Sequence, residues 1–226
     1  MIPETVRTEN LVSPAGTLAE TYLLSFAYPW EALAGIKDYI ISLGESLPAT
    51  EYEKAGDGIW VAKTAVVAPS ASVAGPCIIG PFSEVRHCAY IRGSVLICAH
   101  AVVGNSCECK NSIILDKSQV PHFNYVGDSI LGIGAHMGAG AVTSNFRSDK
   151  KNISIHIGQE TVVPGLRKMG AVIGDHAEVG CGSVLNPGTI LGRDCRVYPL
   201  SSVRGFVPAG HIHKTDGTLT PILPDR

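Results

Sequence analysis

The sequence of 226 residues lacks the features of several large protein classes. No apolar run approaches the roughly 20 residues that a membrane-spanning helix needs, and the polar start of the chain, Met1–Asn10, has no signal-peptide core. Lysine and arginine number 18 against 20 aspartates and glutamates, and no basic block occurs. We therefore expect neither a membrane nor a nucleic acid as a partner.

Cysteine is present, but without the spacing of a metal site or of a disulfide framework. The chain has 7 cysteines, an odd number, and no paired C-x-x-C motif. Cys77, Cys107 and Cys195 instead occupy a small-residue position of the repeat that dominates the chain. We interpret the thiols as reduced core residues of a cytoplasmic protein without a metal site.

An aliphatic residue recurs at every sixth position over much of the chain, and a small or modest side chain follows four residues later. The aliphatic positions are Val61, Val67, Val73, Ile79, Val85, Ile91, Ile97 and Val103, then Ile173, Val179, Leu185, Leu191, Val197 and Val203. A helix repeats near 3.6 residues and a strand at 2, so a period of six requires a short strand followed by a corner. Such hexapeptide repeats are typical of a parallel β-helix, in which each unit buries its apolar side chains by stacking on its neighbours.

This repeat resembles that of the hexapeptide-repeat acyltransferases. The resemblance implies an all-β fold, a left-handed parallel β-helix in which three hexads form one triangular coil. We expect the β-helix over residues 59–208. The repeat loses phase after Leu115, returns at Leu131, Met137 and Thr143, and then stops, which predicts an inserted loop at residues 144–171.

The segments on either side of the repeat have a different composition. Residues 1–58 predict a small, partly helical N-terminal cap whose main helix begins near Pro29 and ends at Gly44. We expect this cap to cover the first coil, because the open end of a β-helix exposes its core and unpaired strand edges. Residues 209–226, which include Pro221 and Pro224, predict an extended C-terminal tail that can reach a neighbouring subunit.

Two cations recur one coil apart. Arg92 and Lys110 each follow an inward position directly and are eighteen residues apart, so they should be stacked neighbours. Two cations this close repel unless an anion lies between them, and a phosphate suits an arginine fork beside a lysine. Glu108 or Asp116 could neutralise them instead, so a phosphate site and a structural ion pair are both open.

The interrupted region carries a more specific motif, which lies in the segments Gly104–Ser112, Pro121–Ser129, Gly138–Gly140 and Thr143–Lys151. In order and spacing, from roughly Ile91 to Pro208, it closely resembles the acetyltransferase half of bifunctional N-acetylglucosamine-1-phosphate uridyltransferases, above all the archaeal-type enzymes. The resemblance implies a CoA-dependent N-acyltransferase that uses acetyl-CoA as co-substrate, needs no metal, and acts on an amino-sugar 1-phosphate or a nucleotide amino sugar.

The resemblance also implies catalytic roles for three residues. His122 matches the general base, and imidazole titrates near neutrality, so it can accept the proton of the attacking amine. Asn145 matches a residue that positions the reactants without ionising. Ala139 matches a residue whose backbone N–H approaches the acetyl carbonyl as an oxyanion donor.

Five residues are the candidates for binding the acceptor. Arg92, Lys110 and Tyr125 match the groups that hold the sugar phosphate, and Lys151 closes the same motif. Where the amino-sugar enzymes have a sugar-contacting asparagine, this chain has His136, and the change puts the identity of the acceptor in doubt.

Recognition of CoA is less specific in the sequence. The resemblance implies that Ala139 and basic residues near the 3′-phosphate bind it, and the candidates are Arg193, Arg196, Arg204 and Lys214. It further implies a homotrimer with the active site between neighbouring subunits. We expect no nucleotidyltransferase domain before the repeat.

Two alternative functions remain. One is a non-catalytic trimer that binds a sugar nucleotide or assembles with a separate nucleotidyltransferase. The other is a zinc enzyme like the γ-carbonic anhydrases, which hold zinc through three histidines on the same type of helix. That family has a close His-x4-His pair, which the coils of this chain lack.

Overall fold

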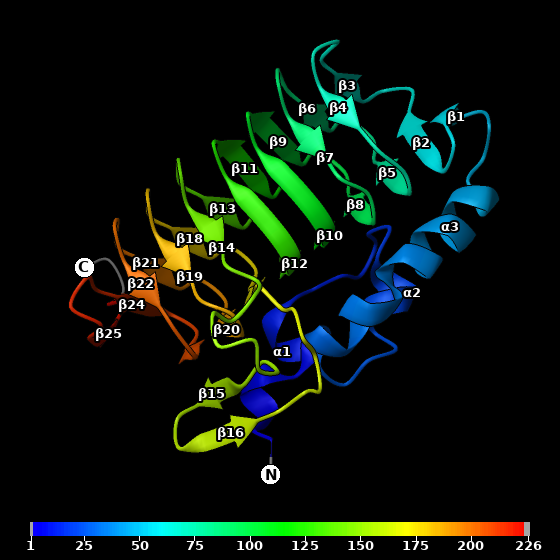
Figure 1. The fold of residues 1–226 in the computed structure, drawn as a ribbon. Coiled ribbons are helices and arrows are strands. Elements are labelled where there is room, and N and C mark those ends of the chain that lie inside the picture. The colour runs from blue at the N-terminus through cyan, green and yellow to red at the C-terminus, as the bar shows by residue number, and fades with distance from the viewer. Residues whose placement is uncertain (1, 224–226) are drawn as a thin grey trace.

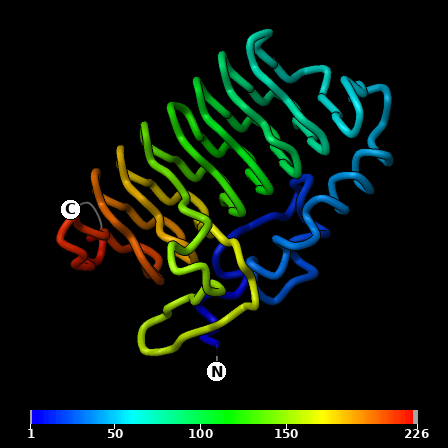
Figure 2. The backbone as a smooth tube through the Cα atoms, viewed as in Figure 1, coloured from blue at the N-terminus to red at the C-terminus, as the bar shows by residue number. Residues whose placement is uncertain are grey.

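The computed structural model, which describes residues 2–223, is a three-sided solenoid. Each coil adds one short strand to each of three faces, and successive coils stack in parallel along one axis (Figures 1 and 2). The predicted fold class, an all-β left-handed parallel β-helix of hexapeptide repeats, is confirmed. No helix within the described residues is long and apolar enough to span a membrane.

We number the faces in the order in which the chain meets them within a coil. The first face consists of β3 (Val66–Val67), β6 (Glu84–Val85), β9 (Val102–Asn105), β11 (Gln119–His122), β13 (His136–Met137), β18 (Glu178–Val179), β21 (Arg196–Val197) and β24 (His211–His213). The second face consists of β4 (Ser72–Val73), β7 (Tyr90–Ile91), the first halves of β10 (Glu108–Ile114) and β12 (Tyr125–Leu131), β14 (Val142–Thr143), β19 (Val184–Leu185) and β22 (Ser202–Val203). The third face consists of β2 (Ile59–Ala62), β5 (Cys77–Ile79), β8 (Val95–Ile97), the second halves of β10 and β12, β17 (Ala171–Ile173), β20 (Thr189–Leu191) and β23 (Phe206–Val207).

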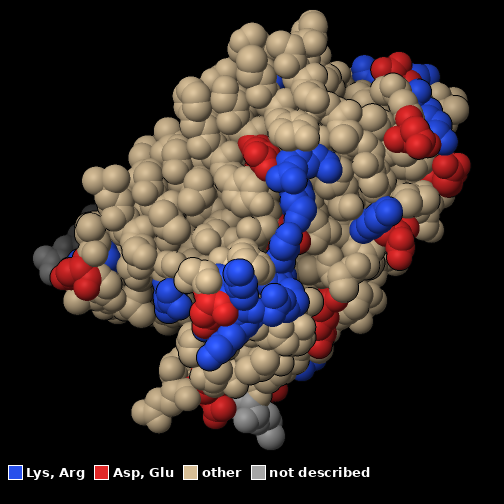
Figure 3. All heavy atoms as spheres, viewed as in Figure 1, with Lys and Arg blue, Asp and Glu red and all other residues tan. Residues whose placement is uncertain are grey.

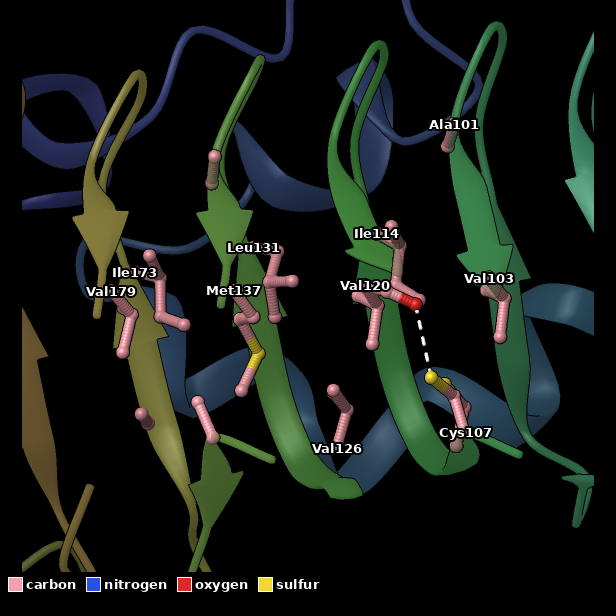
Figure 4. Close-up of a cluster of buried hydrophobic side chains, with 14 of the residues drawn as sticks. Ala101, Val103, Cys107, Ile114, Val120, Val126, Leu131, Met137, Ile173 and Val179 are labelled. Carbon is pink, nitrogen blue, oxygen red and sulfur yellow. Dashed lines mark hydrogen bonds between the residues drawn. The ribbon is translucent and has the colours of Figure 1, made fainter. Parts of the chain in front are cut away.

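The interior of the prism is filled by the repeating side chains that the period of six predicts. Val103, Ile114 and Val120 are fully buried there together with the smaller Ala101 and Cys107 (Figure 4). Because the interior is narrow, each hexad contributes one aliphatic and one smaller side chain to it.

The sequence suggested that the repeat is interrupted after Leu115, but the stacking of the coils continues there. Val120 pairs with Val103 and Val126 with Cys109, seventeen residues earlier in each case. The strands β10 and β12 bend around the corner between the second and third faces, and each shortens its coil by one residue there. A single-residue contraction shifts the numerical phase but keeps the inward side chains in register.

The N-terminal segment is partly helical, as predicted, and its strand β1 covers the edge of the first coil, but its helices extend beyond that coil. Its helices are η1 (Glu4–Val6), α1 (Thr8–Leu11), α2 (Glu20–Leu23), η2 (Pro29–Gly35) and α3 (Ile36–Ser46). They run along the third face, from β2 to β20 (Figure 1). The physical reason is a column of buried, outward-facing apolar residues on that face: Ile78, Leu96, Ile113, Ile130, Val172 and Ile190.

The helix α3 also passes through Gly44, where the sequence suggested that it ends. A Cβ atom at this position would lie 2.4 Å from the Trp60 ring. The glycine therefore lets the helix approach β2 closely instead of stopping it.

Antiparallel strands close both ends of the solenoid. β1 (Tyr52–Gly56) pairs with β2, and β24 forms a hairpin with β25 (Leu219–Pro221) against the last coil. The extended tail predicted for residues 209–226 is therefore wrong over the described part, and its last residues, 224–226, lie outside the described residues. Both additions cover sheet edges that would otherwise offer unpaired N–H and C=O groups.

The predicted inserted loop leaves the solenoid after β14 and returns at β17. It contains an antiparallel hairpin of β15 (Ile155–Ile157) and β16 (Glu160–Val162). Ile153, Ile155 and Ile157 are buried in the same cluster as the N-terminal helices. The insertion is therefore an ordered part of the molecule that packs beside the third face.

Candidate acceptor site

The candidate acceptor site is a pocket built from side chains of several neighbouring coils. A pocket of about 360 Å³ lies where the second face meets the inserted loop. It is lined by Arg92, Lys110, Tyr125, Asn145, Phe146 and Lys168. Lysine and arginine side chains form a continuous strip on this side of the molecule (Figure 3). The structure thus brings together four of the predicted site residues, which the sequence spreads over more than fifty positions.

The register of β7 and β10 explains why the two predicted cations meet. Ile91 pairs with Cys109, so Arg92 and Lys110 follow equivalent positions in neighbouring coils. Their side chains leave the same end of the second face. The one-coil stacking inferred from the eighteen-residue spacing is therefore present.

Each of these cations already has an acidic partner within the chain. Arg92 Nη1 lies 2.6 Å from Glu108 Oε1, and Lys110 Nζ lies 3.4 Å from Asp128 Oδ2. Glu108 was one of the two expected counter-charges, whereas the other, Asp116, accepts a hydrogen bond from the Ala99 N–H elsewhere. The structural ion pair and the phosphate site are therefore not exclusive, because the pairs leave both cations at the pocket wall.

Tyr125 and Asn145 form the polar floor of the pocket. Asn145 Nδ2 donates to the Tyr125 hydroxyl at 3.1 Å. Burial, with a smaller contribution from the Asp128 carboxylate, raises the pKa of Tyr125, so its hydroxyl stays protonated near neutral pH and can donate. Gly127 makes room for both, since a Cβ atom there would lie 2.4 Å from the Tyr125 hydroxyl oxygen.

Asp128 is a site residue that sequence reasoning missed. The residue is only 6% exposed. Its carboxylate accepts hydrogen bonds from Asn111 Nδ2 at 2.9 Å and from Asn145 Nδ2 at 2.5 Å. A sequence signal existed, because Asp128 lies inside the motif between Tyr125 and Ser129. Its partners come from the coils on either side of its own, so only the register reveals them.

Lys168 is the second pocket residue that sequence reasoning did not assign to the acceptor site. The two ends of the inserted loop meet where the Met169 N–H donates to the Asn145 carbonyl at 3.0 Å, which places Lys168 at the pocket. Within the described residues, Lys168 has no acidic partner. The predicted Lys151 is exposed and lies outside the pocket lining, and its N–H donates to Asp149.

Two of the three predicted catalytic residues lie at one corner of the prism. His122 ends the first face in its coil, and Ala139 occupies the same corner in the next coil, where the Gly140 N–H donates to the His122 carbonyl at 2.9 Å. Within residues 2–223, neither the His122 imidazole nor the Ala139 N–H makes a hydrogen bond, and both residues are exposed. Tyr125 begins the second face directly after this corner.

His136 is not in the acceptor pocket. It lies on the first face, where its Nδ1 is 2.8 Å from Glu178 Oε2. The pair borders a shallow depression of about 300 Å³ that also contains Arg196, Cys181 and Tyr198. His136 is therefore absent from the lining of the acceptor pocket, where it was predicted to bind.

The basic candidates for CoA do not gather in one site within the chain. Arg193 is held by Asp175 and by the Glu9 carbonyl, to which its Nη2 donates at 2.8 Å. Its contacts attach the N-terminal segment to the solenoid. Arg196 lies on the first face, Arg204 lines a separate pocket of about 250 Å³ beyond Phe146, and Lys214 lies in the C-terminal hairpin turn.

The described residues contain no group of three or more histidine, cysteine, aspartate or glutamate side chains placed to hold a metal ion.

Comparison with known proteins gives consistent relatives. Residues 73–167 match a family described as the GMPPB C-terminal domain. The chain is 33% identical over 126 residues to a bifunctional sugar-1-phosphate nucleotidylyltransferase/acetyltransferase of Sulfurisphaera tokodaii, with 56% of this chain and 31% of the relative covered. It is 33% identical over 180 residues to the bifunctional protein GlmU of Methanococcus maripaludis, with 78% of this chain and 43% of the relative covered. The resemblance inferred from the sequence is confirmed.

These bifunctional relatives are longer than the chain, which spans less than half of the length of each. Among solved structures, the acetyltransferase domain of PglB from Neisseria gonorrhoeae in complex with acetyl coenzyme A overlaps with a TM-score of 0.40 and 18% identity. The overlap covers 73% of this chain and 57% of that one.

Proposed function

We propose that the chain is a CoA-dependent N-acetyltransferase whose acceptor is an amino sugar that carries a 1-phosphate or a nucleoside diphosphate. The observation that carries the proposal is the pocket that combines Arg92, Lys110 and Lys168 with Tyr125 and Asn145. Its position next to the His122 corner suits an acceptor whose anionic end is held while its amine reaches the corner. Similarity to the bifunctional acetyltransferases supports the acetyl group and CoA.

The anionic group of the acceptor has three cations available. A phosphate dianion can accept from the Arg92 guanidinium and from two lysines at once, since charge-assisted bonds to phosphate are short and strong. Lys168 contributes a full positive charge because no carboxylate neutralises it within the described residues. The Tyr125 hydroxyl adds a neutral donor.

At the corner, the reaction is a direct transfer. The acceptor amine attacks the thioester carbonyl, a C–N bond forms, and His122 takes the proton that the amine loses. The carbonyl oxygen becomes an oxyanion, which the free Ala139 N–H can stabilise. The C–S bond then breaks, and the protonated His122 returns the proton to the departing thiolate of CoA.

We further propose that the active unit is a homotrimer. His122 and Ala139 are exposed at the corner, and nothing within residues 2–223 of one chain encloses them. A neighbouring copy would complete the walls of the site and exclude water from it.

The experiment is an acetyl-transfer assay with product detection by mass spectrometry. Purified protein is incubated with acetyl-CoA and with glucosamine 1-phosphate, galactosamine 1-phosphate or UDP-linked amino sugars. We expect His122→Ala to lose about 10²- to 10⁴-fold in kcat, the typical contribution of a positioned general base. His156→Ala, on the exposed β15–β16 hairpin, is the matched control and should retain full activity. Absence of turnover on every acceptor, or an active His122→Ala, would refute the proposal.

One observation favours a second function, a trimer that binds a sugar nucleotide without acetylating it. Glu108 and Asp128 already neutralise Arg92 and Lys110, as in a purely structural pair. Under this alternative, calorimetry detects binding of UDP-sugars while the assay detects no product. Turnover in the assay excludes it.

A further inference from the structure

We propose that Asp128 is a positioning residue of the acceptor site and that the N-terminal segment holds it in place through Asn111. The inference rests on the proposed function for its kinetic part, while its structural part concerns the chain alone.

The carboxylate of Asp128 is buried, and each of its two oxygens has a partner. Oδ1 accepts from Asn111 Nδ2 at 2.9 Å, and Oδ2 accepts from Asn145 Nδ2 at 2.5 Å and lies 3.4 Å from Lys110 Nζ. Burying a carboxylate is costly unless donors and a cation compensate it. Asp128 has both, so its charge can persist at the edge of the interior.

Two of the three donors are acceptor-site residues, so Asp128 determines how they point. A carboxylate only accepts hydrogen bonds, so the atom of Asn145 that faces it must be the amide nitrogen. The same nitrogen donates to the Tyr125 hydroxyl at 3.1 Å. The amide oxygen of Asn145 has no protein donor among the described residues, which leaves it free to accept a hydrogen bond from an acceptor amine.

Lys110 is oriented by the same carboxylate. Its four-carbon side chain would otherwise sample many rotamers, and ordering it costs entropy when a ligand binds. The contact to Asp128 holds the ammonium group at the pocket wall before the ligand arrives.

The third donor connects this arrangement to the N-terminal segment. An amide NH₂ group has two hydrogens, and those of Asn111 point to Asp128 Oδ1 and to the Leu33 carbonyl of η2 at 3.3 Å. Asn111 has a φ of +46°, a conformation that asparagine adopts more readily than most residues. Although the N-terminal segment contributes no residue to the pocket lining, it reaches the pocket through this one side chain.

The test is Asp128→Asn, which keeps the shape and removes the charge. The new amide offers one acceptor oxygen to three donors and turns its own NH₂ toward a donor. We expect kcat/KM for the acceptor to fall about 10- to 100-fold, the range for lost hydrogen bonds to a charged group, while KM for acetyl-CoA stays within about twofold. In a crystal structure of the variant, we expect the Asn145 side chain and the Lys110 ammonium to leave their positions.

Asp175→Asn is the matched control. Asp175 is also buried, accepts the Ile133 N–H at 2.8 Å and pairs with Arg193. It does not line the acceptor pocket and shares no hydrogen bond or ion pair with a described residue that does. The substitution should lower the thermal midpoint and leave acceptor kcat/KM unchanged. Unchanged acceptor kinetics in Asp128→Asn, or equal kinetic changes in both variants, would overturn the positioning role.

Asn111→Gly tests the connection to the N-terminal segment, because glycine tolerates the positive φ while it removes the amide. We expect about a 3- to 10-fold loss of acceptor kcat/KM, a fraction of the Asp128→Asn effect. Full activity of Asn111→Gly would refute the proposed role of the N-terminal segment in holding Asp128. If the wild-type protein acetylates no acceptor, the crystal structure of Asp128→Asn still decides the positioning role: an unmoved Asn145 refutes it, independently of the proposed function.

Discussion

The second and third faces of the solenoid share one frame and differ in what they show to the outside. On the third face, the outward column consists of Ile78, Leu96, Ile113, Ile130, Val172 and Ile190. On the second face, the equivalent positions, directly before the inward residues, are Tyr90, Glu108, Tyr125, Val142, Val184 and Ser202. The positions directly after the inward residues form a second outward column, which consists of Arg92, Lys110, Gly127, Ser144, Asn186 and Arg204. The apolar inward residues of both faces belong to the same buried cluster.

The difference teaches that inward positions make the prism, while outward positions select what covers each face. An apolar column must be removed from water, and the nearest apolar surface is the N-terminal segment of the same chain. A polar column with a glycine gap instead stays accessible to a charged ligand. Four variants would break or sharpen this comparison, from the largest expected effect to the smallest.

Ile113→Ala should have the largest effect. Ile113 is fully buried between the third face and the N-terminal helices, so truncation leaves a cavity and should lower the free energy of unfolding by about 2–5 kcal/mol. Arg204→Ala, on the exposed column of the second face, should change it by less than about 0.5 kcal/mol. Urea denaturation of both variants gives the comparison, and equal midpoints would show that the N-terminal segment contributes no packing there.

Gly127→Ala should impair the pocket while the fold persists. The added methyl group would meet the Tyr125 hydroxyl and the Asn145 amide, so both must move, and we expect acceptor kcat/KM to fall about 10- to 30-fold for the loss of one or two good hydrogen bonds. Ser144→Ala occupies the next coil of the same column and should leave acceptor kinetics intact. Circular dichroism checks that both variants fold, and a fully active Gly127→Ala would show that the Tyr125–Asn145 arrangement is unnecessary.

Lys168→Ala should weaken acceptor binding moderately. Lys168 is exposed and has no acidic partner in the part of the chain that the structure describes. Its removal should raise the acceptor KM by about 3- to 10-fold at low ionic strength, and the effect should shrink in high salt because surface charges are screened. Lys37→Ala, which removes an exposed lysine from α3, is the charge-matched control. A salt-independent change in KM would argue against a direct charge interaction.

His213 occupies an inward position of the last coil, where the other coils have an apolar side chain. Its replacement should have the smallest effect of the four. His213 is buried, its Nδ1 has no partner within the described residues, and burial lowers the pKa of the imidazole. The folded state thus prefers the neutral form, so this stability is complete above the ordinary histidine pKa near 6.5 and is lost as the pH falls toward the lowered value. Between pH 7 and pH 5.5, the thermal midpoint of the wild type should fall more than that of His213→Leu. Parallel midpoints would contradict the expectation.

Much of the frame follows from the sequence. The period of six predicted the coils, the inward residues and the stacking of Arg92 on Lys110, because each of these depends only on the spacing within the repeat. The sequence also indicates the face on which the N-terminal segment packs. In the adjacent apolar pairs Ile78-Ile79 and Leu96-Ile97, one residue points into the prism and the other points outward. The prediction used only the inward residue and therefore did not place the helices along this face.

The candidate site was predicted in part. His122, Tyr125, Asn145 and the cations were found through a motif, and their catalytic roles stay predictions. Asp128 and Lys168 were not assigned to the site, since neither residue type is unusual at its place in the sequence.

The sequence by itself thus determined the coil, because burial in a narrow prism imposes a strict local period that neighbouring residues reveal. The tertiary structure alone decided which side chains share the acceptor site. Contacts between coils depend on register, and the one-residue contraction at β10 and β12, together with the closed stem of the inserted loop, places Asp128, Asn145 and Lys168 beside Lys110. These contacts join residues 17 to 24 positions apart, so no local motif in the chain reveals them.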